Sequence, residues 1–191
     1  GGSASRTVSF NSSGTDSCLF VFFAISAEED VDGGGSAMSL TGTDVSVTYA
    51  GTTLNKRTND TRSNPFHMWG LAAADNTAGD NNLVVTNTNN SGVGINDAII
   101  CVVNVIGTSF GSSEGNTIED STGDDVTLSG TTSGRLTIGA TYTNAGGTIA
   151  PGSGVTELAT FEDSAGSGNN SIMLGSIQAS GTSTTFSRSE G

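Results

Sequence analysis

Apolar and polar residues alternate along much of this chain with the period of two that is typical of β-strands. The strongest apolar segment is residues 97–107, with the sequence DAIICVVNVIG, in which a glycine ends a nearly unbroken run of apolar residues. Such a run predicts a strand that is buried on both faces, or nearly so. We therefore expect it at the centre of a sheet that is stacked against a second sheet. Residues 18–25 form another heavily apolar segment and are expected to supply the partner layer.

Further strands are expected wherever short apolar or alternating segments lie between turns rich in Gly, Asn and Asp. No window has a helical period. The expected strands are residues 6–10, 18–25, 44–54, 66–71, 82–86, 97–107, 126–128, 136–142, 155–161, 171–177 and 184–187, with a long surface connection at 108–125. Many short strands of this spacing predict an all-β, jelly-roll-like sandwich of two sheets with essentially no helix. We expect residues 1–191 to form a single domain.

Composition and charge narrow the function classes. The 191 residues include 28 glycines, 34% hydrophobic residues and only 13% charged residues, and the net charge is −13. A chain this acidic is repelled by phosphate backbones, which argues against binding to nucleic acid. No apolar run approaches the roughly 20 residues of a membrane-spanning helix, so we expect no membrane partner.

The two cysteines, Cys18 and Cys101, both lie in apolar segments. Free thiols that pack as small hydrophobic groups are favoured over a disulfide, which stays open as the alternative. No Cys-x-x-Cys pattern is present, so thiolate zinc sites and thioredoxin-like chemistry are not expected.

Catalytic patterns are weak. His67 is the sole histidine, it lies beside Met68 and Trp69 in a predicted strand, and no G-x-S-x-G motif accompanies it. A pair of carboxylates could support glycoside hydrolysis, but most acidic residues lie in glycine-rich loops, where solvation is the simpler explanation. We expect a protein that is not an enzyme, without catalytic or cofactor-binding residues.

Calcium is the more reasonable chemistry for the acidic loops, because it takes six to eight oxygen ligands on flexible backbone. Carboxylates gather near glycines at residues 28–35, 75–80 and 119–125, although none of these loops has the EF-hand spacing. Solvated turns are the alternative explanation. The candidate calcium ligands are Asp30, Asp32, Asp120, Asp124 and Asp125.

Aromatic residues that could form a carbohydrate platform are few. Trp69, Tyr49 and Tyr142 all lie within strand patterns that bury aromatic rings, so core packing is favoured over glycan binding.

The order of landmarks over residues 8–106 resembles a β-sandwich domain that recurs in tailed-phage virion proteins, among them tail and decoration proteins, and in bacterial surface proteins. The likeness rests on an apolar strand after a Gly-Thr-Asp turn, a Val-Thr-Tyr-x-Gly-x-x-Leu segment, a Met-Trp-Gly-Leu segment and the long apolar run, found at residues 14–25, 47–54, 68–71 and 97–107. The resemblance implies a structural or attachment module that brings no catalytic residues.

We therefore expect a non-enzymatic structural protein of a phage virion, such as a capsid decoration, tail or fibre component, located in a virion or outside the cell. Its partners are expected to be other copies of itself, in a homo-oligomer, and other virion structural proteins. The alternative is a subunit of an extracellular filament or adhesin, with calcium or a glycan as a candidate ligand.

The end of the chain adds one expectation. Similar proteins finish with a further apolar strand, whereas here residues 188–191 follow the strand at 184–187 directly. A sheet is therefore expected to present an unpaired edge, and such edges pair with strands of other chains.

Overall fold

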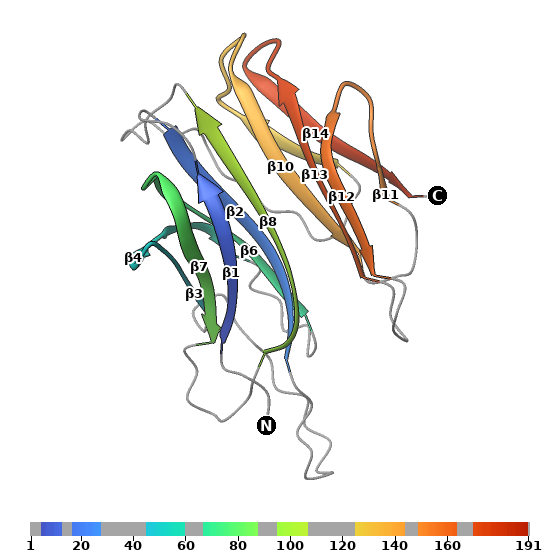
Figure 1. Ribbon diagram of the computed structural model, residues 1–191. Helices are drawn as coiled ribbons and strands as arrows, with labels where there is room; N and C mark the ends of the chain where they lie inside the picture. Colours follow the sequence, from blue (N-terminus) through green and yellow to red (C-terminus); the bar gives the residue numbers. More distant parts are fainter. Residues whose placement is uncertain are drawn as a thin grey trace. The chain divides into compact units, whose positions relative to one another are not determined.

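The computed structural model describes residues 5–12, 17–27, 45–59, 67–87, 95–106, 125–143, 149–163 and 170–190 (Figure 1). Every regular element in these ranges is a strand, and all paired strands are antiparallel. The all-β prediction is thus confirmed. None of the described residues belongs to a helix that is long and apolar enough to cross a membrane.

The chain divides into two compact units, Gly1–Ser112 and Ser113–Gly191. The landmarks of the virion-like resemblance lie in the first unit. Each unit contains two sheets of its own, and we describe the units separately. The expectation of a single domain over residues 1–191 stays a prediction.

Unit 1 contains eight strands in two four-stranded sheets. Their bounds are β1 Ser5–Ser12, β2 Ser17–Ala27, β3 Val45–Tyr49, β4 Thr52–Thr53, β5 Asn55–Asn59, β6 His67–Asp75, β7 Gly79–Asn87 and β8 Ile95–Ile106. One sheet has the order β1-β7-β3-β4 and the other has the order β5-β6-β2-β8. The successive strands β1, β2 and β3 lie in alternate sheets, as do β6, β7 and β8, which is the kind of connection that jelly rolls use.

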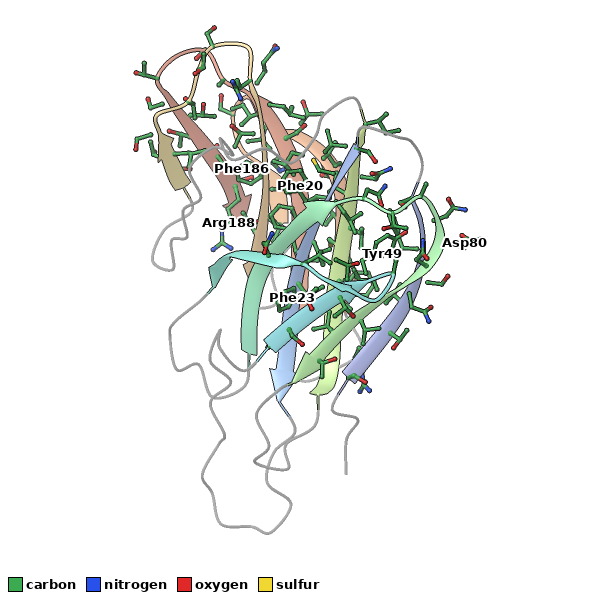
Figure 2. All side chains as sticks on the ribbon, turned by 90° about the vertical axis from the view of Figure 1, so that its left-hand side faces the viewer. Phe20, Phe23, Tyr49, Asp80, Phe186 and Arg188 are labelled. Carbon is green, nitrogen blue, oxygen red and sulfur yellow. The ribbon has the colours of Figure 1, made fainter. Side chains whose placement is uncertain are left out.

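The two sheets of unit 1 face each other across one hydrophobic core. Leu19, Val21 and Phe23 of β2 meet residues of the facing sheet, among them Tyr49 on β3 and Leu83 on β7. The labelled side chains of Phe23 and Tyr49 can be followed in Figure 2. The odd-numbered residues of β2 therefore point into the sandwich, as the period of two predicts.

The hairpin between β3 and β4 is a two-residue turn at Ala50 and Gly51. Both residues have positive φ, 50° and 78°, and Tyr49 pairs with Thr52 across the turn. Positive φ at both central positions is the geometry of a type I′ turn, whose twist matches that of the flanking strands. The glycine turn that the sequence predicts within residues 44–54 is confirmed.

Two predictions about the apolar runs are wrong. β8, which covers residues 97–106 of the run, is not central but lies at the edge of its sheet, and its only hydrogen-bonded neighbour among the described strands is β2. β2 is not in the partner layer, because it pairs side by side with β8 from Ser17 opposite Ile106 to Ala27 opposite Ile95. The central strands of this sheet are β6 and β2. Apolar composition reports burial of side chains but not the number of strands that pair with the backbone, which explains both errors.

Unit 2 contains six strands in two three-stranded sheets. Their bounds are β9 Asp125–Ser129, β10 Leu136–Thr143, β11 Ile149–Pro151, β12 Thr156–Asp163, β13 Asn170–Gln178 and β14 Ser183–Glu190. The sheet orders are β10-β13-β12 and β11-β14-β9. The described residues include two strands outside the expected set, β5 in unit 1 and β11 here.

The core of unit 2 is small. Ile149, Val155, Met173 and Phe186 form one buried cluster, and Ile177 packs against it. These residues come from both sheets, so this unit is also a two-layer sandwich. Phe186 of β14 is labelled in Figure 2.

A pair of glycines makes room for the Phe186 ring. Gly139 of β10 lies directly opposite Gly175 of β13. A Cβ atom added at Gly139 would lie 2.9 Å from Phe186 Cδ2, and one added at Gly175 would lie 3.0 Å from Phe186 Cζ and 2.7 Å from Val155 Cγ1. The ring therefore lies directly over the two glycines, where no side chain would fit without movement.

Candidate functional site

The features of this fold that could engage another molecule are its sheet edges. An edge strand leaves the backbone groups on one side without a partner in its own sheet, and most proteins protect such edges by charges, proline, bulges or short length. The eight edge strands among the described residues are β1, β4, β5, β8, β9, β10, β11 and β12.

Six of these edges carry a recognised protection. β4 and β11 have only two and three residues, and β11 ends in Pro151. β1 carries Arg6 and β9 begins with Asp125. β5 and β12 both contain charged residues and a register shift, between Lys56 and Thr58 and between Glu157 and Ala159.

The edge strand β12 also exposes apolar side chains. Leu158 and Phe161 are 48% and 52% exposed. The shift between Glu157 and Ala159 leaves Leu158 without a Cα partner on β13, which interrupts the ladder. An interrupted ladder between acidic residues is a poor template for a further strand.

The two remaining edges are β8 and β10, and neither contains a proline. β10 has eight residues and no charge, but it contains Gly139, which weakens a strand because it has no side chain to pack against a neighbour. β8 is the longest strand among the described residues, with twelve, and its single charged residue is Asp97.

The side chains of β8 are partly covered. Ile100 and Val102 pack against the core of unit 1, while residues 100–105 are all half-buried and Ile106 at the strand end is 61% exposed. The ladder to β2 is regular from Ile106 to Asp97, and the one register shift leaves Asn96 of β8 without a partner between Ser26 and Ala27 of β2. β8 thus offers ten consecutive residues of regular strand at a sheet edge.

A buried hydrogen-bond chain fixes the end of unit 1 where β6 turns into β7. The hydroxyl of Ser12 donates to the Thr77 carbonyl over 2.7 Å and lies 2.8 Å from Tyr49 Oη. Because the single serine proton is used on Thr77, the Tyr49 hydroxyl donates to Ser12, with the Phe10 and Gly79 carbonyls as alternative acceptors at 3.1 Å each.

The chain continues to the next strand, because Asn81 Nδ2 lies 3.4 Å from Tyr49 Oη and also donates to the Thr77 carbonyl over 3.3 Å. Tyr49 is 3% exposed and Ser12 is 1% exposed, so these bonds form away from water. They tie β1 and β3 to the β6–β7 turn.

A second polar contact holds the same turn to β8. The side-chain nitrogen Asn76 Nδ2 donates to Ser17 Oγ over 3.0 Å and to Asn104 Oδ1 over 3.1 Å. The backbone N–H of Asn76 also donates to the Ser17 carbonyl. Asn104 belongs to β8, so the edge strand is held at this end by side chains as well as by its ladder to β2. The turn is therefore an anchored part of the scaffold that presents β8.

The predicted calcium ligands are mostly outside the described residues. Asp30, Asp32, Asp120 and Asp124 fall there, while Asp125 is exposed at the start of β9, opposite Ser187 of β14. No group of three or more His, Cys, Asp or Glu side chains comes together within the described ranges. Calcium binding at the five aspartates stays a prediction.

The third acidic loop is partly visible. Asp80 lies in β7 with an exposed side chain, labelled in Figure 2 at the edge of the view. Asp75 ends β6, where it pairs with Cys18 of β2. The intervening residues belong to the turn that the buried hydrogen bonds fix.

The aromatic and cysteine predictions are confirmed where the structure describes them. Tyr49 is a core residue, and its ring packs edge-on against Phe10 at a centroid distance of 6.3 Å. The side chains of His67, Trp69 and Tyr142 lie outside the described part. Cys18 is buried, Cys101 is half-buried, and neither forms a disulfide.

The edge strand β8 carries a titratable side chain whose pKa is shifted by its surroundings, the Cys101 thiol. It lies in the middle of β8, opposite Phe22 of β2. Burial raises the pKa of its thiol above the ordinary 9.0, because a thiolate is poorly solvated there. The thiol is therefore protonated and slow to react at neutral pH.

Sequence reasoning missed that β8 is an edge strand, because the segment itself carries no signal of how many strands pair with it. The buried contacts of Ser12 and Asn76 had no signal in the sequence, because their partners lie 37 and 28 residues away in the chain.

Comparison of the chain with protein-family models, with curated proteins and with solved structures finds no match.

Proposed function

We propose that this protein is a non-enzymatic structural component of a phage virion, which acts by assembling with copies of itself and with other virion proteins. The sandwiches are the rigid parts, and sheet edges make the contacts. The observation that carries the proposal is the long edge strand β8, whose ten residues from Asp97 to Ile106 pair regularly with β2 and include no proline or lysine.

The scaffold behind this edge suits a building block. Two cores with fully buried side chains, such as Leu83 and Val85 in unit 1 and Met173 in unit 2, hold each sandwich. Strand addition to a preformed edge needs little reorganisation, because the edge already has the extended geometry of the product. The β6–β7 turn, anchored through Tyr49 and Asn104, keeps one end of the β8 scaffold in place.

The virion part of the proposal is supported by the resemblance of residues 8–106 to a sandwich domain of tailed-phage tail and decoration proteins. The low charge content outside the loops and the net charge of −13 fit a surface protein that stays soluble at high local concentration.

The test has two parts. Light scattering and negative-stain microscopy of the purified chain should reveal rings, trimers or filaments, whereas a monomer at every concentration would contradict the self-assembly. Mass spectrometry of particles purified on a density gradient from the source culture should find this chain in the particle fraction. Recovery in free extracellular filaments instead would favour the filament or adhesin alternative.

The same assembly assay with and without EDTA tests the calcium prediction. Loss of ordered assemblies in EDTA and their return on adding Ca²⁺ would place calcium at the acidic loops. Substitution of Asp120 and Asp124 by Asn should then have the same effect as EDTA, with Asp80→Asn as the control in the third acidic loop.

A further inference from the structure

We infer that β8 is the self-association strand of this protein, and that two copies pair through it, antiparallel, about a two-fold axis at Cys101. The inference rests on the proposed self-assembly and names the edge, the partner and the register. The partner is a second copy of this chain.

The first argument concerns charge. The chain carries 19 acidic residues against 6 basic ones, so two copies repel each other over most of their surface. β8 has Asp97 as its one charged residue, whereas β12 contains Glu157, Glu162 and Asp163. A basic partner would favour the acidic edges, but a second acidic copy pairs best at an edge of low charge, and β8 and β10 are the two long edges of this kind.

The second argument concerns protection. Every other edge strand among the described residues is short, charged, bulged, or interrupted by glycine or proline, and β8 is none of these between Asp97 and Ile106. A long, regular, apolar edge is the most effective template for strand pairing. Pairing two such edges joins two four-stranded sheets into one continuous sheet, without any change within either sandwich.

The register follows from symmetry. A two-fold axis normal to the sheet keeps each side chain on its own face, so it must lie midway between the two copies of one residue. Residues at equal distances before and after that residue then stand opposite each other. Ile100 and Val102 then stay over their own cores. An axis at Cys101 places Ile100 opposite Val102 and Ile99 opposite Val103, which are the β-branched pairs that sheets favour.

A two-fold axis placed one residue to either side of Cys101 would create less favourable residue pairs. An axis at Val102 would place Asn104 opposite Ile100, and an axis at Ile100 would place Asp97 opposite Val103. With the axis at Cys101, the two Asp97 residues are eight positions apart, roughly 26 Å at the rise of a strand. That separation exceeds the Debye length of about 8 Å at physiological salt, so their repulsion is screened.

Cys101 supplies a direct readout of this register. Directly opposed residues in an antiparallel pair have Cα atoms about 4.5–5.5 Å apart, within the range that a disulfide spans. Two thiols on the axis are therefore placed to form one intermolecular bond. The oxidant is supplied by the experiment, takes up two electrons, and the two thiol protons leave to solvent.

The experiment uses the full chain. Sedimentation velocity over a wide concentration range measures dimerisation for the wild type, Val103→Lys and Val8→Lys, with circular dichroism as the check on folding. Val8 is the matched control, because it is an exposed valine on β1, an edge strand of the facing sheet. We expect Val103→Lys to weaken dimerisation roughly tenfold or more, because it places two ammonium groups in the paired ladder, and Val8→Lys to leave it unchanged.

Oxidative cross-linking with copper phenanthroline gives an independent measurement if Val103→Lys does not fold. The wild type should give a covalent dimer, and Cys101→Ser should not. Val103→Cys in the Cys101→Ser background keeps a cysteine on the same strand, two residues from the axis, and should give little cross-link.

The outcomes separate the inference from the proposed function. Self-association that neither Val103→Lys nor Cys101→Ser affects, without a cross-link at Cys101, would overturn the assignment of β8 and leave the proposed assembly in place. A cross-link for Val103→Cys equal to that of the wild type would overturn the axis at Cys101. A wild type that stays monomeric would overturn both the inference and the proposed self-assembly.

Discussion

Replacing Gly175 by alanine is the sharpest test of the packing in unit 2. The added Cβ would lie 2.7 Å from Val155 Cγ1 and 3.0 Å from Phe186 Cζ, and both neighbours belong to the buried cluster. Since carbon atoms pack at about 3.5–4.0 Å, both side chains must move. Neither has free space, because Phe186 is 6% exposed and already covers Gly139.

The magnitude follows from two opposing terms. Overpacking a tight core costs about 1–3 kcal/mol. Alanine also restricts the unfolded chain more than glycine does, which returns about 0.4–1 kcal/mol where the backbone conformation suits it. Gly175 does not have the positive φ of the turn glycines, so this second term applies. We expect Gly175→Ala to lower the free energy of unfolding by about 1–2 kcal/mol.

Urea unfolding followed by far-UV circular dichroism measures this change. The matched control is Gly181→Ala, because a Cβ at Gly181 meets nothing within 4 Å. The control should stay within about 0.5 kcal/mol of the wild type. Removing a clashing group should restore part of the loss, so Val155→Ala should cost less in the Gly175→Ala background than in the wild type.

The reasoning would be refuted if Gly175→Ala were as stable as the Gly181→Ala control. It would also be refuted if the two substitutions at 155 and 175 were simply additive. Gly139→Ala offers an internal comparison, because the three atoms nearest to its added Cβ all belong to the Phe186 ring, with the nearest contact at 2.9 Å. One ring can tilt more easily than two neighbours can separate, so this variant should be the milder of the two.

Three further predictions concern unit 1. Tyr49→Phe removes the hydroxyl bound to Ser12 and should cost about 1–2 kcal/mol in urea unfolding, and most of this loss should disappear in a Ser12→Ala background if the two hydroxyls act together. Ala50→Asn places a residue that tolerates positive φ in the type I′ turn and should raise the melting temperature, whereas Ala50→Val should lower it. Burial raises the pKa of Cys101, so the contribution of its protonated thiol to the free energy of unfolding is fully present below pH 9.0 and is lost as the pH rises through the folded-state pKa. The wild type should therefore lose stability relative to Cys101→Ser above pH 9.0. The difference between their urea midpoints measures this loss.

Much of the fold could be predicted from the sequence because local patterns encode it. The alternation in residues 44–54 and the Ala-Gly pair located a hairpin, and the apolar segments at 18–25 and 97–107 located β2 and β8 to within a few residues. β11 was missed because three residues that end in proline carry no periodic signal. Length and periodicity are properties of a segment, and both can be read from it alone.

The arrangement of the strands could not be predicted in the same way. The choice between the centre and the edge of a sheet depends on which other segments compete for the same backbone groups. β2 takes both β6 and β8 as neighbours, and nothing in the β8 segment itself records this. The contact between Asn76 and Asn104 is also non-local, because the two residues are 28 positions apart in the chain. The side-chain amide of Asn76 reaches Asn104 only after β6, β7 and β8 are in place. The candidate site was therefore visible as a strand but not as an edge.

The pairing of β2 with β8 also affects when unit 1 can fold during synthesis. The residues that pair are between 68 and 89 positions apart in the chain, from Ala27 with Ile95 to Ser17 with Ile106. At a synthesis rate of roughly 5–20 residues per second, β2 leaves the ribosome several seconds before β8 does. Until then β2 lacks one of its two strand partners, and Leu19, Val21 and Phe23 lack the closed core that later covers them. Contacts of such long range also slow the folding of the finished chain. The apolar residues of β2 are therefore exposed to aggregation in the nascent protein until β8, the last strand of unit 1, has been synthesised.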